Sequence, residues 1–215
     1  MSADERKIAE RMLMTELKEL QKENWVHAEP RDGNLFVWNV ALLVVNPTSL
    51  YYGAYLKAEL KMPKNYPMAP PEFRFIRPLF HPNIYKDGKL CISILHTPGD
   101  DEMSGELASE RWSPAQRIFT VLISILSLLD DAEVSSAANV DASVMLRRDP
   151  DNYMRIVKEN VENSKRDIPE GFVMPSHHNT PPPKEEVDDD FWCDSESDFG
   201  GTDSDEDMVF GELGI

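Results

Sequence analysis

Three prolines within five positions most constrain what this chain can fold into. They lie in the segment Tyr66-Pro67-Met68-Ala69-Pro70-Pro71. Proline restricts the backbone φ angle and lacks an amide N–H, so this segment cannot form the interior of a helix or of a central strand. We therefore expect an ordered loop, stiffened by proline, between elements of regular structure.

The stretches around this loop predict strands. They are rich in β-branched and aromatic residues, and turn-forming Pro, Gly or Asn-Pro closes each one. The predicted strands are Asn34–Val45, Tyr52–Met62 and Glu72–Ile76. Their close spacing indicates at least three strands, connected most simply as an antiparallel meander.

Four other segments predict helices. In Ala3–Glu23, apolar residues recur every three to five positions among charged ones, as in an amphipathic helix. Ser113–Leu129 begins with a capping serine and a proline and is mostly apolar, which predicts a helix buried against the sheet. Asp141–Arg148 and Pro150–Arg166 predict two more helices, separated at Asp149-Pro150. Together these elements predict an α+β fold: an N-terminal helix, a meander, a loop region, a buried central helix and two C-terminal helices.

The negative charge of the chain is concentrated near its C-terminal end. The net charge is −17 over 215 residues, and Ser176–Ile215 holds 13 acidic residues against one lysine, Lys184. We expect a globular domain over 1–175 and a disordered acidic tail over 176–215. Such a chain is a poor candidate for nucleic acid, whose phosphates need Lys and Arg, and a basic protein surface is its natural complement. Four aromatic residues make the tail a candidate docking segment: Phe191, Trp192, Phe199 and Phe210.

The cysteines limit the compartment and the chemistry. There are two, Cys91 and Cys193, and no Cys/His cluster with zinc-ligand spacing, so we expect neither a disulfide framework nor a metal site. Without a signal peptide or a membrane-length apolar run, we expect a soluble protein of the cytoplasm and nucleus. Cys91 follows Asn83 by eight residues and lies between turn signals, which suggests a reactive thiol. The alternative is a small buried apolar residue, because free cysteine is often buried.

The order of these motifs resembles that of the ubiquitin-conjugating enzymes over about residues 3–175. After the N-terminal helix and the meander, the shared motifs are Tyr-Pro-x-x-Pro-Pro at 66–71, His81-Pro82-Asn83, Cys91 and Trp112-Ser113-Pro114. The resemblance implies the fold of that family and its activity.

Further features resemble one subclass, the cell-division-cycle enzymes that serve cullin-RING ligases. They are the segments Cys91–His96 and Ser136–Ser143, the acidic tail, and an acidic insert between Cys91 and Trp112. The acidic residues of the insert are Asp100, Asp101, Glu102, Glu106 and Glu110.

The resemblance implies that Cys91 accepts ubiquitin as a thioester and passes it to lysine amines. A thiolate suits this relay because it is both a good nucleophile and a good leaving group. A hydrolase would instead pair the cysteine with a histidine base, and His96 is the only histidine within a dozen residues after Cys91. A carrier should lack that pair, because activated water would hydrolyse its thioester. We expect His81 to order its turn rather than act as a base.

Three further residues are expected in the catalytic group. Asn83 would stabilise the oxyanion of the transfer step or the loop that frames it, and the alternative is a turn asparagine that bonds its own backbone. By resemblance, Ser136 lies in the gate over Cys91, where many relatives carry aspartate; the alternative is a helix-capping serine. Because serine carries no charge, the acidic insert is expected to attract the acceptor lysine. Ser93, two residues after Cys91, completes the group.

The resemblance also implies the partners. No cofactor is expected to be bound, because ubiquitin is carried covalently and the upstream activating enzyme uses the ATP. The expected partners are ubiquitin, the activating enzyme, and the RING domain and cullin of a multisubunit ligase, which together build degradation-signal polyubiquitin. The expected surface for the activating enzyme and the RING domain consists of Arg6, Lys7, Arg11, Met68, Ser113, Pro114 and Ala115. Many relatives have an aromatic residue at the position of Met68, and Pro-Asn in the turn that is Asp130–Glu133 here.

Three other classes of protein remain as alternatives. An inactive relative that only binds ubiquitin would share the fold, but such variants lose the cysteine. An enzyme for another ubiquitin-like modifier would keep the cysteine, and the acidic insert and tail argue against it only by resemblance. An acidic scaffold would fit the tail but has no need of the arrangement from His81 to Cys91.

Overall fold

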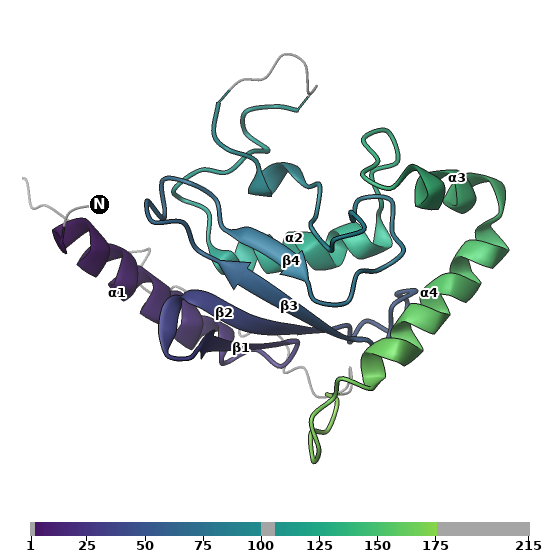
Figure 1. The fold of residues 1–215 in the computed structure, drawn as a ribbon, viewed down its shortest axis with the longest axis horizontal. Coiled ribbons are helices and arrows are strands. Elements are labelled where there is room, and N and C mark those ends of the chain that lie inside the picture. Colours follow the sequence, from purple (N-terminus) through teal and green to yellow (C-terminus); the bar gives the residue numbers. More distant parts are fainter. Residues whose placement is uncertain (1–2, 100–105, 176–215) are drawn as a thin grey trace, which may run out of the picture. The chain divides into compact units, whose positions relative to one another are not determined.

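The computed structural model describes residues 3–99 and 106–175, which form four α-helices, a short 3-10 helix and one four-stranded sheet (Figure 1). The elements in chain order are α1 (Ala3–Leu20), β1 (Val26–Arg31), β2 (Asn34–Leu43), β3 (Tyr55–Lys61), β4 (Glu72–Phe75), η1 (Ser93–Leu95), α2 (Ile118–Asp130), α3 (Val140–Arg148) and α4 (Pro150–Lys165). The α+β fold expected from the sequence is confirmed. No helix in the described ranges is long and apolar enough to cross a membrane.

The sheet is an antiparallel meander in the order β1-β2-β3-β4. Side chains alternate between its faces, because the side-chain period of a strand is two residues. The inner face carries Trp38, Leu60 and Phe75 into the main core, all nearly fully buried. On the outer face, Tyr55 packs with Phe172, their ring centroids 5.7 Å apart, so the segment after α4 covers part of that face.

The helices bury their apolar faces against this sheet. Helix α1 contacts β1 and β2, with Leu13 and Leu20 fully buried, whereas Ile8 is 58% exposed although it follows the apolar spacing. Helix α2 lies behind the sheet in Figure 1 and contributes Val121, Leu122 and other residues to the same core. Helix α4 contacts β3 and α3.

Helix α2 begins five residues later than the sequence predicts. Ser113 and Pro114 belong to an irregular segment, and the N-cap position is Arg117, whose side chain makes no capping bond. Instead, the amide of Ile118 donates to Glu16 Oε2 of α1 at 2.7 Å. The prediction of a cap at Ser113 was wrong because this helix is capped by a residue far away in the sequence.

The boundary predicted at residue 175 stays a prediction. The tail over 176–215 and the acidic residues Asp100, Asp101 and Glu102 lie outside the residues that the structure describes.

Candidate active site

The loop after β4 brings Cys91 back towards the sheet. Two isolated bridges, Arg74 with Lys89 and Ile84 with Leu90, hold the returning chain, and the amide of Phe75 donates to the Gly88 carbonyl at 2.9 Å. Gly88 has a φ of +89°, and a Cβ there would lie 2.2 Å from the Phe75 oxygen. Glycine is therefore required at this turn, and its close packing fixes the chain three residues before Cys91.

Cys91 is a free, partly exposed cysteine at the end of this loop. Its amide donates to the Asn83 carbonyl at 2.9 Å, which joins the two ends of the segment 83–91. The hydroxyl of Tyr85 lies beside the thiol, and the negative charge of a Cys91 thiolate, together with burial and a hydrogen bond to Cys91, raises the pKa of Tyr85. The thiol is thus partly exposed on a loop held by backbone hydrogen bonds, so the buried apolar alternative does not describe it.

Neither nearby histidine is placed as a partner of Cys91 in the described contacts. His81 is fully buried, its Nδ1 accepts from the Asn83 amide at 3.1 Å, and burial lowers the pKa of its ring to about 4. His96 directs Nδ1 at the Glu106 carboxylate, 2.8 Å from Oε1. His81 therefore orders its own turn, and these contacts do not form the dyad of a cysteine hydrolase.

The Asn83 side chain is bound to the loop that follows α2. Its Nδ2 donates to the Glu133 carbonyl at 2.8 Å and reaches the Ser136 carbonyl at 3.4 Å, and its Oδ1 accepts from the Glu133 amide at 2.9 Å. Asn83 is 1% exposed. The alternative of a turn asparagine that bonds only its own backbone is therefore wrong, because its amide ties down the loop 133–136.

Ser136 is exposed on this loop and does not cap the following helix. The N-cap of α3 is Asn139, whose side chain accepts from the Ala142 amide at 3.3 Å, while its own amide donates to the Pro82 carbonyl at 2.8 Å. The helix-cap alternative for Ser136 is therefore wrong. The loop is fixed at one end by Asn83 and at the other by Pro82.

The base of the acidic insert is built around Glu106. Its carboxylate accepts from Ser93 Oγ at 3.0 Å and lies 2.8 Å from His96 Nδ1 and 3.1 Å from Arg111 Nε. Burial favours the neutral acid, yet the hydrogen bonds from His96 and Ser93 prevail and hold the pKa of Glu106 below its ordinary value. Of the other acids, Glu110 is exposed and accepts from the Leu107 amide at 3.1 Å. Of the five acids expected in the insert, Glu106 is therefore the one engaged by side chains of the fold, and the structure describes Glu110 as exposed.

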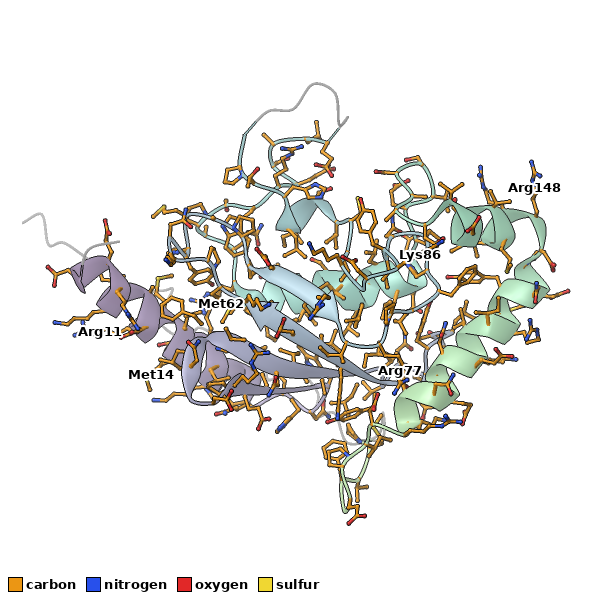
Figure 2. The ribbon with its side chains drawn as sticks, in the orientation of Figure 1. Arg11, Met14, Met62, Arg77, Lys86 and Arg148 are labelled. Atoms are coloured by element: carbon orange, nitrogen blue, oxygen red, sulfur yellow. The ribbon has the colours of Figure 1, made fainter. Side chains whose placement is uncertain are left out.

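The residues expected to bind the activating enzyme and the RING domain come from three segments. Arg6, Lys7 and Arg11 are exposed on α1, where Figure 2 labels Arg11, and Met68 is 63% exposed in the proline loop. Pro114 and Ala115 are exposed and Ser113 is partly buried, in the segment before α2. Indole Nε1 of Trp112 donates to the Pro67 carbonyl at 2.8 Å, so the second and third segments lie side by side.

Sequence reasoning missed several residues of these regions. Arg111 and Tyr85 carry no motif that distinguishes them. Glu16, however, lies on the apolar side of α1 between Leu13 and Leu20, and an acidic residue in an apolar stripe is a signal that could have drawn attention.

Comparison with known proteins gives the class. A family model described as ubiquitin-conjugating enzyme matches residues 12–161. The fold and this match agree: the chain belongs to the ubiquitin-conjugating enzyme family, a family of transferases.

Individual relatives support the same assignment. Ubiquitin-conjugating enzyme E2-34 kDa of Saccharomyces cerevisiae is 46% identical over 176 residues, which cover 78% of this chain and 59% of the yeast protein. Human ubiquitin-conjugating enzyme E2 G2 is 42% identical over 155 residues, covering 71% of this chain and 93% of the human protein. Ubiquitin-conjugating enzyme E2-18 kDa of Schizosaccharomyces pombe is 42% identical over 154 residues, covering 70% of this chain and 92% of that protein.

Proposed function

We propose that this protein accepts ubiquitin as a thioester on Cys91, transfers it to lysine amines, and builds polyubiquitin with a cullin-RING ligase. The observation that carries the proposal is the setting of Cys91. It is a partly exposed thiol on a loop held by Asn83 and Gly88, and neither His81 nor His96 is placed beside it as a base. That arrangement suits a carrier that must load a thioester and protect it from water.

The reaction has two steps. In the first, the Cys91 thiolate attacks the thioester carbonyl of ubiquitin on the activating enzyme; a new C–S bond forms, the old one breaks, and the cysteine of the activating enzyme leaves as a thiolate. In the second, a neutral lysine amine attacks the Cys91 thioester, and the carbonyl oxygen becomes an oxyanion. The C–S bond then breaks and the Cys91 thiolate leaves as the isopeptide bond forms. The proton lost by the amine passes to water or to the departing thiolate.

Asn83 acts in the second step mainly through the loop that it holds. Both of its amide hydrogens are directed at loop carbonyls, Glu133 at 2.8 Å and Ser136 at the longer distance of 3.4 Å. The weaker of these contacts is the one that would be released to donate to an oxyanion. Ser136 lies on the same loop, the proposed gate over Cys91. Ser93 donates a hydrogen bond to Glu106 and so links the cysteine segment to the insert.

The insert attracts the acceptor lysine through its acids other than Glu106. Glu106 is already satisfied by Ser93, His96 and Arg111, so it anchors the insert. The attraction then falls to Asp100, Asp101, Glu102 and the exposed Glu110, whose charges lie within the 21 positions between Cys91 and Trp112.

The ligase class and the compartment are proposed from sequence similarity, charge and composition. The similarity to the yeast E2-34 kDa protein, the acidic insert and the −12 charge of Ser176–Ile215 favour a multisubunit ligase with a basic cullin surface. The two-cysteine composition favours the reducing cytoplasm and nucleus. No bound cofactor is needed, because the activating enzyme uses the ATP.

A charging assay tests the central proposal. Incubation with activating enzyme, ATP and ubiquitin should give an adduct that a reducing agent removes. Cys91→Ser should give at most an adduct that resists reduction, whereas the matched variant Cys193→Ser should charge normally. An unchanged reducible adduct on Cys91→Ala would reject the proposal, and retained ubiquitin binding without any transfer would favour an inactive adaptor.

A further inference from the structure

Glu16 joins three segments that are distant in the sequence. Its Oε1 accepts from the Tyr66 hydroxyl at 2.6 Å, and its Oε2 accepts from the Ile118 amide at 2.7 Å. The carboxylate on α1 therefore holds the start of the proline loop with one oxygen and the start of α2 with the other.

The burial of Glu16 makes these two hydrogen bonds important for the fold. Glu16 is 6% exposed, and a carboxylate buried to this extent would destabilise the fold if it had no hydrogen-bond partners. Burial raises the pKa of the Glu16 carboxyl, although the bonds from Tyr66 and Ile118 and the charge of Arg117 oppose the rise. Arg117 itself pairs with Glu19 one turn along α1, at 2.7 Å. The helix does not need Glu16 for apolar contact, because Leu13, Leu17 and Leu20 supply that face.

The segments held by Glu16 carry all the residues expected to bind the activating enzyme and the RING domain. Two surface hollows lie along these segments, and Glu16 lines the first while its partner Tyr66 lines the second. One, of about 430 Å³, is lined by Arg11, Pro114 and Ala115, and the other, of about 320 Å³, by Ile8, Pro67 and Met68. Since a surface built from three separate segments binds well only if their spacing is maintained, a residue that bridges all three controls that spacing.

We propose that Glu16 is a positioning residue for the surface that binds the activating enzyme and the RING domain, because it sets the spacing of α1, the Tyr66–Met68 loop and the start of α2. This inference rests on the proposed function. Glu16 is buried and its carboxylate binds Tyr66 and Ile118 rather than Cys91, so it acts on partner binding and not on the chemistry of transfer.

The test separates partner binding from chemistry. Glu16→Ala leaves the Tyr66 hydroxyl and the Ile118 amide without their acceptor, whereas Glu16→Gln keeps one acceptor for Ile118 and an amide that the Tyr66 hydroxyl can accept from. We expect Glu16→Ala to raise the KM of this protein for charging by the activating enzyme about tenfold, in line with the loss of buried hydrogen-bond partners. Glu16→Gln should restore the KM to within about twofold. Discharge of the purified thioester onto free lysine, without a ligase, should change far less than the KM.

Matched variants decide the outcome. Glu19→Ala removes only an exposed ion pair with Arg117, so it should leave the KM nearly unchanged, and Met68→Ala should raise it. If Met68→Ala raises the KM and Glu16→Ala does not, the inference is overturned while the proposed function stands. The same holds if Glu16→Ala lowers the rate of charging by the activating enzyme and the rate of ligase-free discharge by one common factor. If wild type fails to charge, both fall together. Should Glu16→Ala not fold, Tyr66→Phe provides the same test with one bond removed, and an unchanged KM for it overturns the inference.

Discussion

The side chain of Asn83 binds the backbone of Glu133 in both directions. Its Nδ2 donates to the Glu133 carbonyl at 2.8 Å, and its Oδ1 accepts from the Glu133 amide at 2.9 Å. This paired contact joins the turn that precedes Cys91 to the loop that carries Ser136, across 50 positions of sequence. This paired contact therefore fixes one end of the loop 133–136, while the bond from the Asn139 amide to the Pro82 carbonyl fixes the other.

We expect Asn83→Ala to charge with ubiquitin but to discharge slowly onto lysine. The loss should be about 10²-fold or more, the scale seen when one oxyanion donor is removed. Loss of the paired contact should also lower the free energy of unfolding by about 1–3 kcal/mol. Single-turnover discharge and urea unfolding measure the two effects separately.

Asn139→Ala is the matched control for that variant. It removes the α3 cap, which is worth about 1 kcal/mol, but leaves the contacts of Asn83 in place. If Asn83→Ala discharges at the normal rate per folded molecule, Asn83 has only a structural role.

Glu106→Gln should loosen the base of the acidic insert. The glutamine cannot form the ion pair with Arg111, and it has one acceptor oxygen instead of two for Ser93 and His96. Transfer to acceptor ubiquitin should therefore fall several-fold while charging stays nearly unchanged. Because the folded pKa of Glu106 lies below its ordinary value of 4.5, its contribution to stability is present above that value and lost as the pH falls below it. Melting temperatures of wild type and Glu106→Gln between pH 7 and pH 3 measure this pH-dependent contribution to stability. Equal slopes of melting temperature against pH in the two proteins would contradict it.

Gly88→Ala should destabilise the loop that leads to Cys91. The substitution combines a positive φ of +89° with a Cβ 2.2 Å from the Phe75 carbonyl, so we expect a loss of more than about 1 kcal/mol. Gly33→Ala is the matched control, because Gly33 has a φ of +74° but open space around its Cβ. Urea midpoints that fall by the same amount in both variants would show that the close contact with Phe75 is unimportant.

Neutralising Asp100, Asp101 and Glu102 to their amides should slow chain building more than charging, because the amides no longer attract an acceptor lysine. Ser136→Asp should compensate in part, since it adds a charge at an exposed position on the loop that Asn83 holds. The rate of ubiquitin chain extension, measured with preloaded enzyme, checks both changes. Equal rates for wild type and the neutralised insert would reject a role for these charges.

Removing Asp188–Ile215 should leave charging intact and weaken ligase-dependent transfer. The removed segment holds most of the negative charge near the C-terminal end, and its attraction to a basic cullin surface should raise the association rate. Ser195, Thr202 and Ser204 each precede an acid by three positions, so their phosphorylation by an acid-directed kinase should strengthen docking. The difference between the full chain and the truncated one should fade as salt rises. A tail that only aids solubility would leave the association rate and its salt dependence the same.

Most of the fold followed from periodicity, and the exceptions have clear causes. The strands β2, β3 and β4 and the helices α3 and α4 agree with prediction to within a few residues. Strand β1 was not predicted, because Val26–Arg31 contains Pro30 and few strand-forming residues, and it is stabilised by pairing with β2. Within the site, Cys91 and Asn83 were found from their motif, whereas the partners of Asn83 and of Glu106 were not.

The sequence by itself determined the features that depend on residues close together in the chain, namely helix positions, helix breaks and the proline loop. Apolar spacing produced α1, the Asp149-Pro150 pair separated α3 from α4, and the prolines at 67, 70 and 71 excluded regular structure. Only the tertiary structure decided which distant groups meet: Glu16 caps Ile118 across 102 positions, and Asn83 binds Glu133 across 50. The physical reason is that a buried hydrogen bond depends on the distance between its partners in space, whereas a sequence pattern reports only on residues a few positions apart.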